Sequence, residues 1–309
     1  MIPFSSLLRC LPGLCVMLLA ACSAPRSVIQ SGKVTPRGEF RVGGNTGVNV
    51  GTAALGKLTG AVKELAEEAA DKDTVNYRPA LDQVQAAALA YALDPTVATS
   101  DLYVRYGVFD RIDVGYKYSF GAHSLDAMYQ FMGPIGTPEK PGGAAGANYG
   151  SIGLQFSTQR AKLPSIPFLN DAERLLGFSA RRIDLLVPLV FSHSFGAEEE
   201  IGSISYGLAY SHSFLKYGFE PGKIYTGPGS GQTTQKLPSV SGRQSFGALG
   251  AFANLKIGYR YAYFLPALAI YYQNYGTYQL LNNKETKLKG VTIIPSIGVQ
   301  FRIPNTRNR

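Results

Sequence analysis

An alternation of apolar and polar residues with a period of two runs through most of this 309-residue chain and confines it to β-structure. The last segment shows it most clearly, because Val291, Ile293 and Ile297 share one parity while Thr292 and Ser296 take the other. Successive side chains of a strand point to opposite faces, so each such segment predicts a strand with one apolar and one polar face.

Ten segments alternate in this way, and most of them have at least nine residues. About 9–11 tilted residues cross a bilayer as a strand, and an even number of antiparallel strands closes with both chain ends on one side. We predict an all-β fold, a closed antiparallel transmembrane β-barrel of about ten strands over residues 38–303, with eight and twelve strands left open. The segments are residues 38–51, 102–108, 112–120, 124–132, 149–160, 183–195, 202–214, 245–258, 261–274 and 291–303.

Composition disfavours several other classes. The chain is 45% hydrophobic and 17% charged, and after residue 21 it lacks the run of about 18 apolar residues that a membrane-spanning helix needs. The formal charge of +9 is spread along the chain without a basic stripe, so we expect no nucleic-acid binding. All three cysteines lie within the first 22 residues, which leaves no disulfide framework and no thiolate metal site. We expect no cofactor and no metal.

Residues 1–21 have the anatomy of a secretory signal peptide, with an early positive charge, an apolar core and small residues at the end. The run Leu19-Ala20-Ala21-Cys22 resembles the lipobox of bacterial lipoproteins. That resemblance implies cleavage before Cys22 and lipidation of its thiol, which would anchor the chain in a membrane. Ser23, where Asp would imply retention, implies passage to the outer membrane. The alternative is a conventional signal peptide in which Cys22 is incidental.

Three segments depart from the strand pattern. Residues 22–37, rich in Ser, Pro and Gly, show no apolar period and predict a flexible tether. Residues 53–94 predict a helical insertion with helices at 53–71 and 79–93. This hairpin either caps or plugs the barrel, or packs externally on its own strands. Residues 304–309 form a C-terminal tail.

With the lipidated end periplasmic and the first strand running outward, long connections fall mostly outside and short turns mostly inside. The outward loops 161–182, 215–244 and 275–289 together hold 11 Lys/Arg and 4 Asp/Glu. They suit the phosphates of lipopolysaccharide or another anionic ligand, and simple solvated charge is the alternative. The inward connection 133–148 is unexpectedly long. The acidic run 198–200, in another inward turn, is expected to be a solvated cluster.

The polar parity predicts the residues that line the lumen. Because a barrel of about ten strands is narrow, near-balanced charges on that face favour pairing across the interior. A small selective pore is the alternative. The predicted lumen-lining charges are Glu39, Arg41, Arg105, Asp113, Lys117, Asp126, Asp184, Lys256 and Arg302.

Over residues 38–303 the chain resembles a bacterial outer-membrane β-barrel. Its last strand carries Ser296-x-Gly298-x-x-Phe301-x-Ile303, which is similar to the terminal signal read by the barrel-assembly machinery. The tail after Ile303 departs from that signal, since many such proteins end on the aromatic residue. The resemblance implies an outer-membrane location, surrounding lipid that includes lipopolysaccharide, and the assembly machinery as a partner.

One group of catalytic residue types falls together in the sequence, namely His123, Ser124 and Asp126. His123 and Ser124 are adjacent, and adjacent side chains of a strand point apart. We therefore expect the protein not to be an enzyme.

The leading functional hypothesis is a lipid-anchored narrow or gated channel for small solutes, with the helical hairpin as gate or plug. The second is a closed structural or surface-interaction barrel that binds a partner through its external loops. Less favoured are a barrel enzyme and a soluble β-rich periplasmic lipoprotein held only by its lipid.

Overall fold

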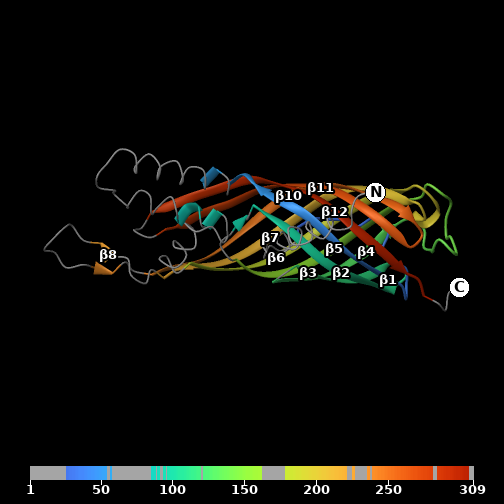
Figure 1. The fold of residues 1–309 in the computed structure, drawn as a ribbon, viewed down its shortest axis with the longest axis horizontal. Helices are drawn as coiled ribbons and strands as arrows, with labels where there is room; N and C mark the ends of the chain where they lie inside the picture. Colours follow the sequence, from blue (N-terminus) through green and yellow to red (C-terminus); the bar gives the residue numbers. More distant parts are fainter. Residues whose placement is uncertain are drawn as a thin grey trace, which may run out of the picture.

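Ten strands close into a single antiparallel barrel in the computed structural model of this chain (Figure 1). The predicted fold, with ten strands, is confirmed. The structure describes residues 26–53, 56–57, 85–87, 89–90, 93–94, 96–119, 121–161, 178–220, 225–226, 235–236, 239–280 and 284–305. The barrel strands are β1 (Phe40–Gly51), β2 (Val97–Phe109), β3 (Ile112–Ser119), β4 (Ala122–Met132), β5 (Asn148–Ala161), β6 (Phe178–Ser194), β7 (Gly202–Phe219), β10 (Val240–Tyr259), β11 (Ala262–Gln279) and β12 (Glu285–Ile303).

The first and last strands close the barrel. Phe40 of β1 lies opposite Tyr106 of β2 on one side and opposite Ile303 of β12 on the other. All the other strands pair with their neighbours along the chain, and β7 pairs with β10. Between these two strands, β8 (Tyr225–Thr226) and β9 (Gln235–Lys236) form a separate two-stranded sheet.

The outer surface of the barrel is an apolar belt. On β11 the outward residues Phe264, Leu268, Ile270 and Tyr272 are 43–57% exposed, while inward neighbours such as Tyr271 are buried. This inversion, with large apolar side chains outside, is typical of a barrel that faces lipid. In the described part of the chain, no helix is long and apolar enough to cross a membrane.

The two ends of the barrel differ. We call one the turn end, because the β2–β3, β6–β7 and β10–β11 connections there are short. It lies at the right of Figure 1, where the C-terminus is marked. The β6–β7 connection there contains a short 3-10 helix, η1 (Ala197–Glu199). The opposite end, which we call the loop end, carries the β1–β2, β5–β6, β7–β10 and β11–β12 connections.

Several strands run further toward the loop end than the alternation predicted. β7 continues to Phe219 instead of ending at residue 214, and β10 begins at Val240 instead of residue 245. Outward positions in these extensions carry charged residues; for example, Arg243 of β10 lies opposite Lys216 of β7. Hydropathy therefore stops alternating although the backbone pairing continues, so the barrel projects beyond its apolar belt.

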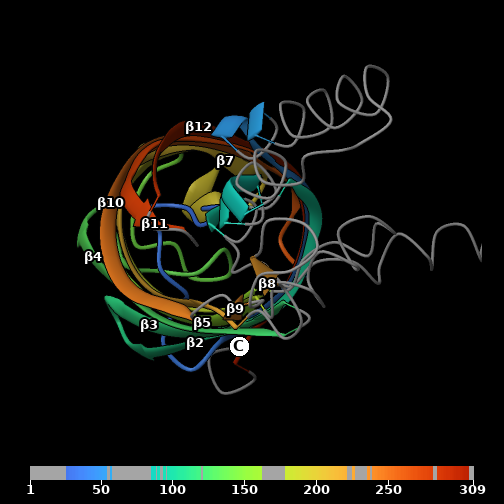
Figure 2. The same cartoon turned by 90° about the vertical axis from the view of Figure 1, so that its left-hand side faces the viewer.

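Residues 26–36, which we call the lumen segment, lie inside the barrel (Figure 2). This corrects the expectation of a flexible tether over 22–37, of which residues 22–25 lie outside the described residues, as does the predicted signal peptide. Val28, Lys33 and Thr35 are at most 4% exposed. An extended segment against a polar wall needs no apolar period, so its sequence resembles a linker.

Close approach to the wall explains the glycine of the lumen segment. A Cβ at Gly32 would lie 2.7 Å from the carbonyl oxygen of Tyr149, so no larger side chain fits without a shift. The Gly32 N–H donates to Ser192 Oγ at 3.0 Å. At the turn end, Gly38 with a φ of +77° turns the chain into β1. A positive φ of this kind favours glycine.

The described residues of the predicted helical insertion are helical at 53, 56–57, 85–87, 89–90 and 93. Gly56 is exposed, whereas the helical residues from 85 onward are buried in the loop end. Leu89 and Leu93 are both 0% exposed and belong to one cluster with the inward-facing Phe219 and Tyr275. These residues plug the loop end and do not pack outside it. Most of 53–84 lies outside the described residues.

A charge in the apolar belt should destabilise the barrel according to its depth. We expect Leu268→Arg, at the middle of the outward row of β11, to lower the free energy of unfolding by about 2–4 kcal/mol. Thr277→Arg, exposed on the same strand beyond Tyr272, should cost about 1 kcal/mol or less. Urea titration in phospholipid vesicles, read by the mobility of the folded barrel on a gel, measures both. Equal losses would contradict a lipid-facing belt.

Candidate functional site

The interior of the barrel is the candidate functional site, because the chain places most of its buried charge there. The nine predicted lumen-lining residues are all at most 9% exposed. They lie on the inward faces of their strands or, for Glu39, directly before β1. The structure joins them into several groups that also include residues of the lumen segment and of the connections.

Arg105 of β2 is the centre of the first group. Its Nε donates to Asp113 Oδ2 at 3.2 Å and its Nη2 donates to Asp113 Oδ1 at 2.5 Å, while Nη1 donates to Asp126. Asp113 Oδ2 also accepts the backbone N–H of Thr35 at 2.7 Å. One arginine therefore ties together three adjacent strands and holds the lumen segment against them.

Arg302 of β12 is the centre of the second group, at the turn end. Its Nε and Nη2 donate to the two carboxylate oxygens of Glu39 at 2.7 and 2.6 Å. Its Nη1 and Nη2 also donate to Glu139 of the β4–β5 connection at 3.0 and 2.6 Å. The Arg302 guanidinium lowers the pKa of the Glu139 carboxyl to about 2. The long 133–148 connection thus folds back to cover the turn end.

The acidic run 198–200 is not the solvated cluster that we expected. Glu198 and Glu199 are 3% and 1% exposed. Glu198 binds Lys33 and accepts the backbone N–H of Gly142 at 2.8 Å, while Glu199 accepts Lys256 Nζ at 3.0 Å. Both glutamates have positive φ, 54° and 60°, which turns their side chains into the lumen. The buried Lys33 and Lys256 neutralise the two carboxylates that this conformation buries.

A third group lies at the loop end. Arg26 of the lumen segment donates to Gln273 Oε1 at 2.7 Å and lies 3.9 Å from Asp94. Arg182 donates to Asp184 Oδ1 at 2.6 Å and also binds the carbonyl oxygen of Leu93, as Arg26 does at 3.2 Å. The lumen segment and the helical insertion therefore share their hydrogen-bond partners.

The buried charges of the described residues balance. Eight cations face eight carboxylates. Two of the cations, Arg26 and Lys33, come from the lumen segment, and Asp94 comes from the insertion. The cations are Arg26, Lys33, Arg41, Arg105, Lys117, Arg182, Lys256 and Arg302; the carboxylates are those of Glu39, Asp94, Asp101, Asp113, Asp126, Asp184, Glu198 and Glu199.

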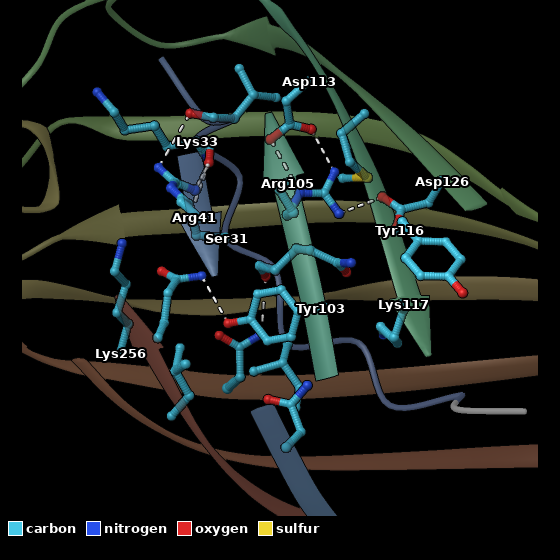
Figure 3. A pocket seen from close by; sticks show the side chains of 18 residues that line it. Ser31, Lys33, Arg41, Tyr103, Arg105, Asp113, Tyr116, Lys117, Asp126 and Lys256 are labelled. Carbon is cyan, nitrogen blue, oxygen red and sulfur yellow. Dashed lines mark hydrogen bonds and ion pairs between the residues drawn. The ribbon is translucent and has the colours of Figure 1, made fainter. Parts of the chain in front are cut away.

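One cavity lies between these groups and the lumen segment. The cavity, shown in Figure 3, has a volume of about 30 Å³, which is room for about two waters. Arg41 projects beside it and donates to the carbonyl oxygens of Lys33 and Val34 at 2.9 and 3.3 Å. Lys117, which also lines the cavity, has no ion-pair partner within the described part of the chain.

The candidate catalytic residues are not brought together. His123 is exposed on the outer wall, where its Nδ1 lies 2.7 Å from the Tyr116 hydroxyl. Ser124 faces inward and bonds to Ser157 at 2.7 Å, and Asp126 belongs to the Arg105 group. Within the described residues, no three His, Cys, Asp or Glu side chains are placed to hold a metal.

The residues of the terminal signal lie in the C-terminal half of β12, toward the turn end, and belong to both faces of the strand. Phe301 and Ile303 are 50% and 48% exposed on the apolar belt, while Ser296 is buried inside. Recognition of these residues by the assembly machinery stays a prediction. Residues 306–309 of the tail lie outside the described residues.

Sequence reasoning missed several members of the site. Arg26 and Lys33 were assigned to the tether, and Asp101 precedes the segment 102–108 by one residue. Part of this signal is visible in the sequence, because cations occur in the tether and Asp101 has inward parity. Asp94 gave no such signal, since its burial depends on where the insertion packs.

A closed antiparallel barrel with an apolar outer belt and a polar, charge-paired interior is the architecture of transmembrane β-barrels. No protein-family model matches this chain, and none of the curated proteins matches its sequence. Three solved structures give general likenesses. Ail of Yersinia pestis is 12% identical with a TM-score of 0.30, and the match covers 86% of this chain and 99% of that chain. Neisserial surface protein A is 9% identical with a TM-score of 0.32, over 86% of this chain and 99% of that chain, and the outer membrane protein OprG of Pseudomonas aeruginosa is 10% identical with a TM-score of 0.29, over 88% of this chain and 99% of that chain. The barrel assignment rests on the strand pairing of this chain.

Removing Arg105 should cost far more than removing an exposed arginine. Arg105→Ala leaves Asp113 and Asp126 buried without their cation, and we expect a loss of about 3–5 kcal/mol in the free energy of unfolding. Arg243→Ala, at an exposed position, should stay within about 0.5 kcal/mol. Urea titration measures both variants. If neutralising Asp113 and Asp126 to Asn in the Arg105→Ala background restored nothing, the charge explanation would be wrong.

The Glu139 contact should make stability depend on pH in the acid range. Its pKa of about 2 in the folded protein lies below the ordinary value of 4.5. The contact therefore stabilises fully above pH 4.5 and is lost as the pH falls from there toward 2. We expect the stability difference between the parent and Glu139→Gln to shrink over this range. A difference that stays constant with pH would rule out ionised Glu139 as its source.

Proposed function

We propose that this protein is a bacterial outer-membrane β-barrel, lipid-anchored through Cys22, whose lumen is closed by its own chain and which acts through the surface of its loop end. The observation that carries the proposal is the filled lumen, with the lumen segment held by partners from the turn end to the loop end. This favours the closed surface-interaction barrel over the channel.

Opening the lumen would separate several buried ion pairs. Withdrawing the lumen segment separates Lys33 from Glu198 and Arg26 from Asp94, and it breaks the hydrogen bond from the Thr35 N–H to Asp113. Breaking a buried pair by removing one partner typically costs about 3–5 kcal/mol. A resting open state is therefore strongly disfavoured.

A row of four cations marks the outer wall at the loop end. Arg160, Arg181, Lys216 and Arg243 lie on the adjacent strands β5, β6, β7 and β10, and each is directly opposite the next in register. All four are exposed, and none has an ion pair or side-chain hydrogen bond within the part of the chain that the structure describes. Like charges directly opposite each other destabilise a sheet unless an anion neutralises them.

The partner that fits this row is a layer of phosphate groups. Neighbouring strands are about 4.8 Å apart, so the row presents guanidinium and ammonium groups at a repeat that closely spaced phosphates can bridge. The row lies just beyond the apolar belt, where lipid headgroups lie. We infer that the loop end binds the phosphates of lipopolysaccharide.

The gated channel remains the second candidate because part of the inner wall is hydroxyl-lined. Ser151, Ser203 and Ser205 are buried and face inward, and their hydroxyl oxygens have no partner within the described residues. Such a wall suits water if the lumen segment moves.

Conductance in planar bilayers distinguishes the two functions. We expect the parent protein to give no steady conductance and a variant lacking both residues 26–35 and residues 53–94 to give discrete openings, because the two deletions remove the lumen segment and the insertion that plugs the loop end. Steady openings of the parent protein would favour the channel. A control that lacks Asn305 and the residues after it, outside the lumen, should remain silent.

Neutralising the row should weaken binding to lipopolysaccharide. Each cation near an anionic surface contributes about 1 kcal/mol, so Arg181→Gln with Lys216→Gln should lower affinity about 10- to 30-fold at low salt. Nanodiscs with and without lipopolysaccharide serve as the probe. Arg37→Gln with Arg111→Gln, at the turn end, is the matched control. Equal weakening by both pairs would overturn the assignment of the row.

A further inference from the structure

The contacts of the lumen segment follow one another in order along the barrel axis. Thr35 binds Asp113 near the start of β3, at the turn end. Gly32 binds Ser192 near the end of β6, and the carbonyl oxygen of Gln30 accepts Asn254 Nδ2 of β10 at 3.1 Å. The segment therefore runs from the turn end toward the loop end as the residue numbers fall.

Arg26 lies at the far boundary of the apolar belt. Its carbonyl oxygen accepts the Tyr271 hydroxyl at 2.8 Å, and its guanidinium binds Gln273. Tyr271 lies nine residues along β11 from Ala262 at the turn end. At about 3.4 Å per residue and a tilt of about 40°, that is about 23 Å along the axis, close to the ~25 Å height of an apolar belt.

The outward residues of β11 locate the same boundary independently. Tyr272, next to Tyr271, is 57% exposed, and the next exposed residues toward the loop end are the polar Asn274, Thr277 and Gln279. Arg26 therefore lies inside the barrel at the level where the membrane ends on the loop side.

Chain length then decides where Cys22 can be. Four residues span at most about 14 Å, whereas the turn end is about 23 Å away through a lumen that the chain already fills. We infer that the mature N-terminus leaves the barrel at the loop end, so that Cys22 is presented on the loop-end side of the membrane. This reverses the periplasmic placement assumed from the sequence. It rests on the proposed cleavage before Cys22, and acyl chains on that residue then enter the leaflet at the loop end.

Thiol labelling in intact cells tests this placement. After signal cleavage, Cys10 and Cys15 are lost and a lipidated Cys22 has no free thiol, so Ala24→Cys introduces the one reactive thiol of the chain. Asn283→Cys in the β11–β12 connection reports the loop end, and Asn308→Cys in the tail reports the turn end. Each variant is treated with a membrane-impermeant maleimide before lysis, after lysis and after denaturation. The parent chain gives the background from Cys22.

We expect Ala24→Cys to be labelled in the same condition as Asn283→Cys and not to follow Asn308→Cys. Labelling of Ala24→Cys together with Asn308→Cys would overturn the inference, and so would labelling only after denaturation, which would place residue 24 within the lumen. Labelling of the parent chain in intact cells, together with Ala24→Cys and Asn283→Cys, supports the placement while rejecting lipidation. The failure of the lipid proposal is thereby distinguished from the failure of the inference.

Discussion

The pairing of β1 with β12 is the contact on which the rest of this molecule depends. In lipid every backbone N–H and C=O needs a partner within the protein, so a sheet spans the bilayer only when it closes on itself. Closure at eight strands leaves an interior that side chains of the wall just fill. Closure at ten strands leaves a wider interior, and in this protein the lumen segment and the insertion occupy the space that the side chains of the wall do not fill. The strand count therefore explains why part of the chain lies inside the barrel.

Filling a polar lumen with polypeptide removes charges from water, and the structure compensates by pairing them. Lys33 lies in the lumen beside the inward-facing Glu198 and Glu199, and Arg26 lies beside Asp94 of the insertion. A buried pair of this kind adds little net stability, but the loss of one partner is costly. The interior is thus better understood as a device that fixes one arrangement of the chain than as a source of stability. The same pairing makes the turn end, the wall and the loop end interdependent.

Period-two hydropathy predicted the strand number, the inward faces and the loop and turn ends, because lipid imposes the alternation directly. It failed where that constraint ends. Beyond the belt, positions such as Lys216 and Arg243 face water or headgroups, so the alternation disappeared while the strands continued. Inside the barrel, the lumen segment contacts polar walls, and its composition could not be told from that of a linker. The burial of Glu198 and Glu199 depended on partners distant in sequence, which no local pattern records.

The close approach of Gly32 to Tyr149 and Ser192 has a consequence for sequence change within the lumen segment. A Cβ at this position would lie 2.7 Å from a backbone carbonyl oxygen of β5, which cannot move away without distorting the strand. A substitution that an exposed linker accepts without cost should therefore displace the segment or strain the wall here. The lumen segment has the composition of a linker and the restricted sequence freedom of a buried strand.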